Sequence, residues 1–233
     1  MRNECWAIIP ARAGSKGVKG KNLKKLGNMP LVCYSIQKLQ EAKCFDKIIV
    51  TSDCSDILKV SQEHGADIHL RNNNEESNDI VMPDIPVISC LKSFSKELRP
   101  MFSFMIQCTS PFIKVSSYQR AYEKLLNHPN STVFAAHDSH DFLWQPKTES
   151  DTNSSWIPIN HLFHERVGRQ YKKNYQVNET GAFYGFPTED FISARHRFFS
   201  EAFPVIIEDD ELVDINNSSD WAYAEYINKI RSM

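Results

Sequence analysis

A short stretch near the N-terminus combines glycine and positive charge in a way that suits phosphate binding. It holds four of the eight glycines in the chain, Gly14, Gly17, Gly20 and Gly27. The same stretch carries six basic side chains and no acid: Arg12, Lys16, Lys19, Lys21, Lys24 and Lys25. Glycine lets backbone N–H groups turn toward a ligand, and open α/β sheets bind ligands at the carboxyl ends of strands such as the one expected before this stretch. The pattern therefore predicts a phosphate-binding loop.

The glycine spacing excludes the two common nucleotide-binding loops. The G-x-x-x-x-G-K-[ST] pattern is absent because Gly20-Lys21 is followed by Asn22, and the three-residue spacing of the glycines does not fit G-x-G-x-x-G. The alternative is a solvated basic loop whose glycines serve only in turns.

Apolar patterns indicate the elements that would position this loop. Continuous or alternating apolar runs predict strands at 7–10, 47–51, 67–71, 102–107, 132–136, 182–186 and 204–207. Helical spacing links Val32, Ile36 and Leu39, and it links Tyr118, Ala121, Tyr122, Leu125 and Leu126 behind an expected N-cap at Ser116. A last helix from 218 or 219 would carry Tyr223, Tyr226, Ile227 and Ile230 on one face. Strands alternating with helices predict an α/β fold, a mostly parallel sheet with helices on both faces.

One long polar segment, residues 137–178, interrupts the alternation. It contains isolated aromatic residues such as Phe142, Trp144 and Trp156 but no clear periodicity. Unstructured segments of this length are uncommon inside a compact domain. We expect a lid or an arm that packs on a second subunit, with disorder as the alternative. No linker divides the chain, so a single domain over 1–233 with this insertion is expected.

Composition argues against several classes of partner. The net charge of −2 gives no global positive field of the kind that attracts nucleic acid. No apolar run approaches the roughly 18 to 20 residues of a membrane span, and no secretory signal is recognised. The six cysteines form no C-x-x-C pair and several have apolar neighbours, which favours reduced thiols. We expect a cytoplasmic protein that binds neither nucleic acid nor membrane.

The N-terminal signature resembles that of the acylneuraminate cytidylyltransferases, the CMP-sialic acid synthetase family. The similar residues are Ile8-Ile9-Pro10-Ala11-Arg12-Ala13-Gly14-Ser15-Lys16-Gly17 and Lys21-Asn22. Further blocks follow in family order: 44–53, Leu70-Arg71, Gln107-x-Thr109-Ser110-Pro111, 181–184, Val213-Asp214-Ile215 and Asp220-Trp221. The resemblance implies a Rossmann-like nucleotidyltransferase fold, a homodimer with a dimerisation arm, and transfer of CMP from CTP to a nine-carbon 2-keto sugar acid with release of pyrophosphate.

The resemblance also implies roles for residues that would bind CTP. Arg12 and Lys21 match catalytic triphosphate ligands. The other implied CTP-binding positions are Ala11, Gly14, Ser15, Lys16, Asn22, Arg71 and Ser110. For Arg71 the alternative is a surface charge that follows a strand.

A magnesium site is implied near the C-terminus. Asp214 matches the first carboxylate of the family's D-x-D motif and is expected to be catalytic, while Asn216 stands in place of the second carboxylate. An amide oxygen can ligate Mg2+ but contributes no formal charge, so the resemblance implies Mg2+ held by Asp214 and Asn216. Acids cluster near the C-terminus, and most of them are expected to form a solvated turn: Glu208, Asp209, Asp210, Glu211, Asp214 and Asp220.

The acceptor pocket matches the family less closely. Gln107, Arg169 and Tyr184 match positions implied to bind the sugar acid. Ile113 and Thr180 depart from the family pattern, which has arginine and asparagine there. The acceptor would be sialic acid or a bacterial analogue such as legionaminic or pseudaminic acid.

Two other functions remain open on the sequence. One is cytidylyl transfer to a different acceptor, such as an octulosonate or a phosphonate, because the departures lie near the acceptor and metal positions. The other is a nucleotide-binding regulatory subunit that has lost turnover through the amide at Asn216.

Overall fold

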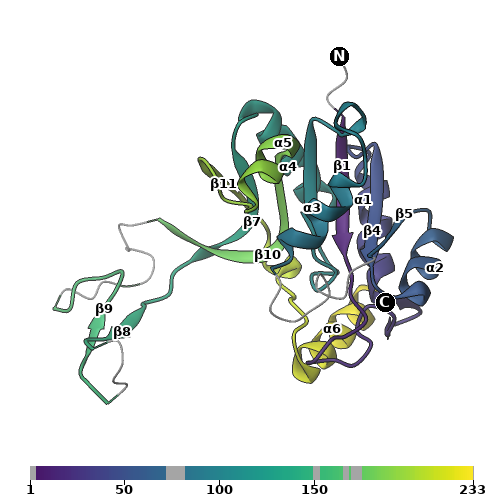
Figure 1. Cartoon of the computed structure of the whole chain (residues 1–233). Helices are drawn as coiled ribbons and strands as arrows, with labels where there is room; N and C mark the ends of the chain where they lie inside the picture. The colour runs from purple at the N-terminus through teal and green to yellow at the C-terminus, as the bar shows by residue number, and fades with distance from the viewer. Residues whose placement is uncertain (1–3, 72–81, 149–152, 165–167, 169–174, 233) are drawn as a thin grey trace.

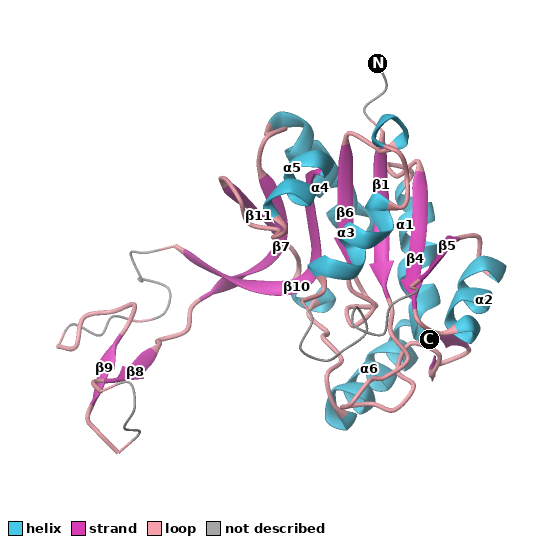
Figure 2. Ribbon diagram, viewed as in Figure 1, coloured by secondary structure: helices cyan, strands magenta, loops and turns pink. Residues whose placement is uncertain are grey.

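The computed structural model describes residues 4–71, 82–148, 153–164, 168 and 175–232 of the chain. Its centre is a seven-stranded sheet in the order β11-β7-β10-β6-β1-β4-β5 (Figure 2). The strands are β1 (Cys5–Pro10), β4 (Lys47–Ser52), β5 (Asp67–Leu70), β6 (Phe102–Ile106), β7 (Thr132–Ser139), β10 (Gln176–Pro187) and β11 (Ala202–Ile206). β10 runs antiparallel to β6 and β7, and the other neighbours are parallel. The predicted mostly parallel sheet and its seven strands are confirmed.

Helices cover both faces of the sheet (Figure 1). α1 (Leu31–Ala42), α2 (Ser55–Glu63) and α4 (Val115–Asn127) pack on one face, and α3 (Asp84–Lys92) and α5 (Thr188–Ala194) pack on the other. β1 and β6 are therefore buried along almost their whole length, which explains their continuous apolar runs. Within the described residues no helix is both long and apolar enough to cross a membrane.

α6 (Ser218–Arg231) packs through a different face than the apolar spacing suggested. Trp221 and Ala224 are buried against Leu26, Leu31 and Ile215 in a separate small core. The aromatic face expected to pack is largely exposed, at Tyr223 (53%), Tyr226 (60%) and Ile230 (51%). Ile227 is the one residue of the expected face that packs against this core, because α6 meets a narrow stripe formed by several loops and the start of α1.

The predicted serine cap of α4 is wrong. The helix begins at Val115, its N-cap is Lys114, and no side chain of the cap residue bonds to the helix. Ser116 therefore lies inside the first turn. A carboxylate from a distant part of the chain, Glu211, accepts a hydrogen bond from the Lys114 N–H at 2.7 Å and takes part of the role of a local cap.

The polar segment 137–178 forms a projecting arm in its described parts (Figure 1). β7 and β10 extend beyond the sheet, and β8 (Trp144–Pro146) pairs antiparallel with β9 (Trp156–Pro158) toward the far end. Trp144 and Trp156 are 41% and 45% exposed in the single chain. The described parts of this segment therefore project from the sheet, while the packing of an arm on a second subunit stays a prediction.

Gly185 tests the packing of the central strands. A Cβ at this position would lie 2.4 to 2.7 Å from three ring atoms of Phe104 on the neighbouring strand. We expect Gly185→Ala to lower the free energy of unfolding by about 1–3 kcal/mol, because the buried ring must move. Chemical denaturation would measure the loss. Gly14→Ala is the matched control, because a Cβ there meets nothing within 4 Å. An equal loss in both variants would contradict the packing argument.

Candidate active site

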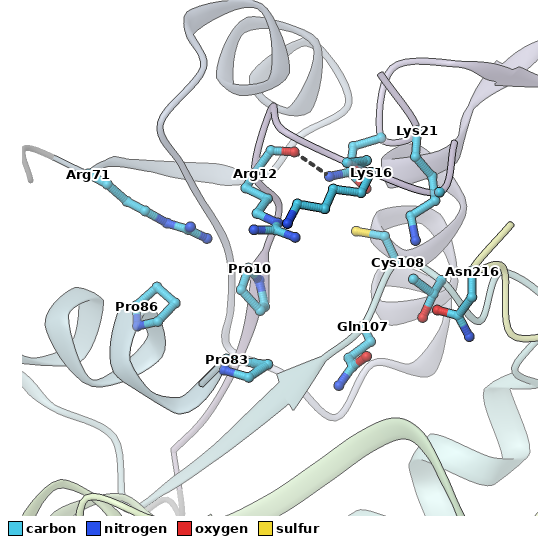
Figure 3. A pocket seen from close by; sticks show the side chains of 14 residues that line it. Pro10, Arg12, Lys16, Lys21, Arg71, Pro83, Pro86, Gln107, Cys108 and Asn216 are labelled. Carbon is cyan, nitrogen blue, oxygen red and sulfur yellow. Dashed lines mark hydrogen bonds between the residues drawn. The ribbon is translucent and has the colours of Figure 1, made fainter. Parts of the chain in front are cut away.

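A cavity of about 390 Å³ lies at the carboxyl ends of β1, β5 and β6 (Figure 3). Open α/β sheets bind ligands at this edge, because the loops that leave parallel strands converge there. The predicted residues that line it are Arg12, Ser15, Lys16, Lys21, Asn22, Arg71, Gln107 and Asn216. Gly17 of the predicted phosphate-binding loop also lines it, and the lining residues that sequence reasoning did not assign to the site are Pro10, Pro83, Pro86, Cys108 and Thr109. Eight of the predicted residues therefore line one cavity, and the glycine-rich loop forms one of its walls.

The glycine-rich loop is held by hydrogen bonds at both of its ends. The Ala13 N–H donates to Oδ1 of Asp53 at 2.9 Å, and Nδ2 of Asn22 donates to the carbonyl oxygen of Arg12 at 2.9 Å. Gly20 adopts φ +61°, a left-handed conformation that a residue with a Cβ adopts at a cost. Asn22, predicted to touch the nucleoside, is 7% exposed and thus also braces the loop.

The C-terminal loop packs directly on the glycine-rich loop. A Cβ at Gly17 would lie 1.7 Å from the carbonyl oxygen of Asn216, so only glycine allows this approach. Nζ of Lys21 donates to the carbonyl oxygen of Ile215 at 2.6 Å, and the Ile215 N–H donates to the carbonyl oxygen of Thr109 at 2.9 Å. The loops after β1, β6 and β11 therefore form one connected wall of the cavity.

The cavity is cationic. Four basic side chains line it, Arg12, Lys16, Lys21 and Arg71, and no carboxylate is among its described lining residues. Figure 3 shows Arg71 on one side and Lys21 on the other, with Arg12 and Lys16 between them. Fork-shaped guanidinium groups and ammonium point charges bind phosphate oxygens through charge-assisted hydrogen bonds. The arrangement suits a ligand with several negative charges.

Burial determines how two of the lining groups titrate. Burial lowers the pKa of Lys21. The positive charge of the nearby Arg12 lowers this pKa further, while the negative charge of Asp214 raises it. Burial also raises the pKa of the Cys108 thiol to about 12. The thiol therefore stays protonated at neutral pH, and Cys108 is unsuited to act as a nucleophile.

Arg71 is a buried residue, which excludes the alternative of a surface charge. It is 7% exposed, and its Nη2 donates to the carbonyl oxygen of Thr51 at 2.8 Å. Its Nε donates to Oγ1 of the same residue at 3.3 Å. These bonds to β4 fix the guanidinium at the edge of the cavity.

Asp214 and Asn216 lie side by side on the extended C-terminal loop. The buried side chains of Val213 and Ile215 alternate with the exposed side chains of Asp214 and Asn216, as expected for extended backbone. Nδ2 of Asn216 donates to Oδ2 of Asp214 at 2.6 Å. Asp214 lines a smaller neighbouring cavity of about 180 Å³, so the pair stands between the two cavities.

The remaining predicted site residues occupy different positions. Ser110 lines the smaller cavity with Asp214, and Ala11 is fully buried in the core, so only its backbone could approach a ligand. Gly14 is exposed at the outer part of its loop. Tyr184 is 2% exposed, its hydroxyl donates to Oε1 of Glu179, and its ring lies under the Arg197 guanidinium.

Some of these positions could have been found from the sequence and others could not. Arg169 lies outside the described residues. Cys108 and Thr109 belong to the Gln107-x-Thr109 block, which offered a signal for them. Pro83 and Pro86 gave no such signal, because they enter the cavity only through the placement of α3.

An open, mostly parallel sheet with a cationic cavity at the carboxyl ends of its strands defines a nucleotide-binding α/β protein. All four of these cations lie within residues 6–157, which match a family model described as cytidylyltransferase. The chain belongs to this cytidylyltransferase family.

Individual relatives agree with this assignment. The pseudaminic acid cytidylyltransferase of Campylobacter jejuni is 25% identical over 99% of this chain and 97% of its own length. N-acylneuraminate cytidylyltransferase A of Danio rerio is 28% identical over 94% of this chain, which spans 49% of that protein. A solved CMP:2-keto-3-deoxy-manno-octonic acid synthetase, in complex with CTP, superposes with a TM-score of 0.72 over 99% of this chain and 100% of that one. At 12% identity this last likeness concerns the fold.

Lys21 provides a direct test of the cavity. We expect Lys21→Ala to raise the KM for CTP or to lower turnover by at least about tenfold, about 1.4 kcal/mol, because one charge-assisted phosphate contact is lost. Steady-state kinetics with varied CTP would measure the change. Unchanged kinetics would place the triphosphate elsewhere.

The lowered pKa of Lys21 also predicts a pH dependence. The protonated ammonium binds phosphate, so kcat/KM for CTP should be full below this pKa and fall as the pH rises through it. In Lys21→Arg the guanidinium stays charged, and the fall should disappear. An alkaline fall at the same pH in both proteins would assign it to another group.

Proposed function

We propose that this cytidylyltransferase transfers CMP from CTP to the anomeric hydroxyl of a nine-carbon 2-keto sugar acid and releases pyrophosphate. The observation that carries the proposal is the cavity lined by four cations and no described carboxylate, at the edge of the sheet where nucleotides bind. Relatives that span most of this chain act on pseudaminic acid and N-acylneuraminate, according to their names. Sialic, legionaminic and pseudaminic acids are therefore the acceptors we consider.

Different residues of the site would bind different parts of the two substrates in this reaction. The acceptor oxygen bonds to the α-phosphorus of CTP, the bond from that phosphorus to the bridging oxygen breaks, and pyrophosphate carries away the electron pair while the hydroxyl proton passes to solvent. Arg12, Lys16 and Lys21 would hold the triphosphate and offset the charge that grows on the leaving group. Asn22 and Arg71 would contact the nucleoside. Gln107 lines the same cavity and would orient the acceptor.

Asp214 and Asn216 would hold Mg2+ in this proposal. Their oxygen donors suit a hard cation, and the described residues contain no group of three or more His, Cys, Asp or Glu side chains placed to hold a metal. With one carboxylate and one amide, the site would need phosphate and water oxygens to complete the coordination. When bound, Mg2+ supplies positive charge that stabilises the pyrophosphate.

A pyrophosphate-release assay tests the proposed function. The purified protein would be incubated with CTP, Mg2+ and, separately, sialic, legionaminic, pseudaminic and octulosonic acids. We expect release with at least one nine-carbon acid and little with the octulosonate. Release with the octulosonate alone would overturn the proposed acceptor class. Binding of CTP without release in any mixture would favour the regulatory alternative.

The proposed role of Asp214 as a metal ligand predicts how turnover changes when its carboxylate is removed. We expect Asp214→Ala to keep less than about a tenth of wild-type turnover, a loss of more than roughly 1.4 kcal/mol in the barrier. The fold should persist, because Val213 and Ile215 supply the packing of this loop. Turnover and thermal unfolding, measured together, separate the two effects. Retained turnover would contradict the role of Asp214.

Asn216→Asp adds a carboxylate to the proposed metal site, whereas Asp214→Ala removes one. It would place a second carboxylate where the amide now donates to Asp214 at 2.6 Å, so the two charges repel until a cation binds between them. We expect a lower Mg2+ concentration for half-maximal rate and a larger rise of Tm on adding Mg2+ than in the wild type. A weaker metal response would show that Asn216 has another role.

The proposal includes a homodimer formed through the arm. Leu162 and Phe163 are 64% and 59% exposed near its far end, beside the half-exposed Trp144 and Trp156. A cluster of exposed apolar side chains on a projecting hairpin is typical of an interaction surface. We also place the protein in the cytoplasm, because its six cysteines are free and thiols persist in a reducing compartment.

The dimer can be tested by sedimentation equilibrium at micromolar concentration. We expect a dimer for the wild type and a shift toward monomer for Trp144→Asp, because a charge would be buried in the interface. Leu98→Asp is the matched control, since Leu98 is a 65% exposed side chain outside the arm. A fully active wild-type monomer would contradict this part of the proposal.

A further inference from the structure

Glu211 is a buried carboxylate in a stretch that otherwise exposes its acids. Glu208, Asp209 and Asp210 are exposed, as expected for a solvated turn, but Glu211 is 1% exposed. Glu211 is therefore the exception among the acids of the expected solvated turn. Burying a carboxylate costs free energy unless hydrogen-bond donors satisfy its oxygens. The donors that contact Glu211 therefore explain how its carboxylate is stabilised.

Three donors satisfy the Glu211 carboxylate. Oε1 accepts from the Lys114 N–H and from the Ser117 hydroxyl, both at 2.7 Å, and Oε2 accepts from the Glu208 N–H at 2.8 Å. Ser117 in turn accepts from Nη2 of Arg120 at 3.0 Å. The carboxylate thus fastens the short helix Asp209–Glu211 to the start of α4.

The residues that follow Glu211 lead directly into the nucleotide cavity. Val213 and Ile215 are buried, which leaves little freedom between the Glu211 anchor and the cavity wall. The Ile215 carbonyl oxygen then accepts from Nζ of Lys21, and Asn216 packs against Gly17. An anchored Glu211 therefore sets where this carbonyl and the Asp214 carboxylate stand.

We infer that Glu211 is a positioning residue for the nucleotide site: its buried carboxylate fixes the segment 212–217 so that Lys21 and Asp214 are held at the cavity. Glu211 lines the smaller cavity with Asp214 but not the nucleotide cavity, and its three hydrogen bonds go to protein donors, so it acts on the nucleotide cavity through the Ile215 carbonyl and the backbone of Asp214. The inference rests on the proposed function for the metal part of its test, while its CTP part requires only that the cavity bind CTP.

Glu211→Gln is the informative substitution. All three partners are donors, so an amide NH2 at either oxygen position would face at least one N–H or O–H group. The side chain keeps its size, and one hydrogen bond or more is lost. Ser117→Ala, which removes one donor and leaves the carboxylate, is a second and milder variant.

Glu208→Gln is the matched control. Glu208 is the N-cap of the same short helix: its side chain accepts from the Glu211 N–H and pairs with Nζ of Lys114 at 2.6 Å, but it is 61% exposed. The substitution removes the same charge from the same loop, keeps an amide oxygen that can accept from the Glu211 N–H, and leaves the three donors of the Glu211 carboxylate in place. Exposed ion pairs contribute little, so we expect kinetics close to the wild type.

The experiment measures CTP affinity by calorimetry without metal and the Mg2+ concentration for half-maximal pyrophosphate release. For Glu211→Gln we expect both the CTP dissociation constant and the Mg2+ midpoint to rise by about fivefold or more, and for Ser117→Ala a smaller rise in the same direction. A role confined to folding would lower Tm and the active fraction but leave both values unchanged. That result, or equal effects in Glu208→Gln, would overturn the inference.

The two parts of the experiment also separate this inference from the proposed function. If the wild type released no pyrophosphate with any acceptor, the proposed function would fail, and the CTP affinity of Glu211→Gln would still decide the positioning role. If the wild type turned over normally and the variant bound CTP as well as the wild type, only the positioning role would fail.

Discussion

The site depends on close packing between the glycine-rich loop and the C-terminal loop. Lys21 and Ile215, which form a hydrogen bond between these loops, are 194 positions apart in the chain. Gly17 lets the Asn216 backbone approach to a distance that any side chain would prevent, and the Lys21 ammonium spans the same junction. Packed interiors transmit small displacements, so a shift of either loop would move the cations and the Asp214 carboxylate together. The geometry of the cavity is therefore a property of the whole fold, because one of these loops follows the first strand and the other follows the last.

The second constraint is electrostatic. A protein with a net charge of −2 gathers four cations around one cavity, where like charges repel and burial lowers the pKa of Lys21. Backbone carbonyls offset part of this cost: the Thr51 oxygen accepts from Arg71 and the Ile215 oxygen accepts from Lys21. The cations are thus oriented before a ligand arrives, and a polyanion relieves their repulsion when it binds. Such preorganisation is what stabilises charge that develops during phosphoryl chemistry.

The sequence predicted those features that depend on local pattern. Continuous apolar runs located the strands, and glycine with basic residues located the cavity loop, because both signals come from neighbours in the chain. Long-range contacts left no such signal. Glu211 resembles its exposed neighbours in composition and is buried only because the start of α4 offers it donors. The aromatic face of α6 has helical spacing, yet the surface that it would need for burial is absent from the described chain. Pro83 and Pro86 line the cavity because α3 begins there.

The amide at Asn216 is explained by its contact with Asp214. Without a cation, two carboxylates 2.6 Å apart would repel strongly, whereas the amide donates a hydrogen bond and holds the Asp214 carboxylate in one orientation. The Asp220 carboxylate supports the same arrangement, because it accepts from the N–H groups of Asn216 and Asn217 at 2.8 and 2.9 Å. The start of α6, the Asn216 amide and Asp214 therefore form one hydrogen-bonded unit at the edge of the cavity. In the proposed reaction, this unit would bind Mg2+ less tightly than a carboxylate pair, because the amide adds no charge and now directs its NH2 group toward Asp214.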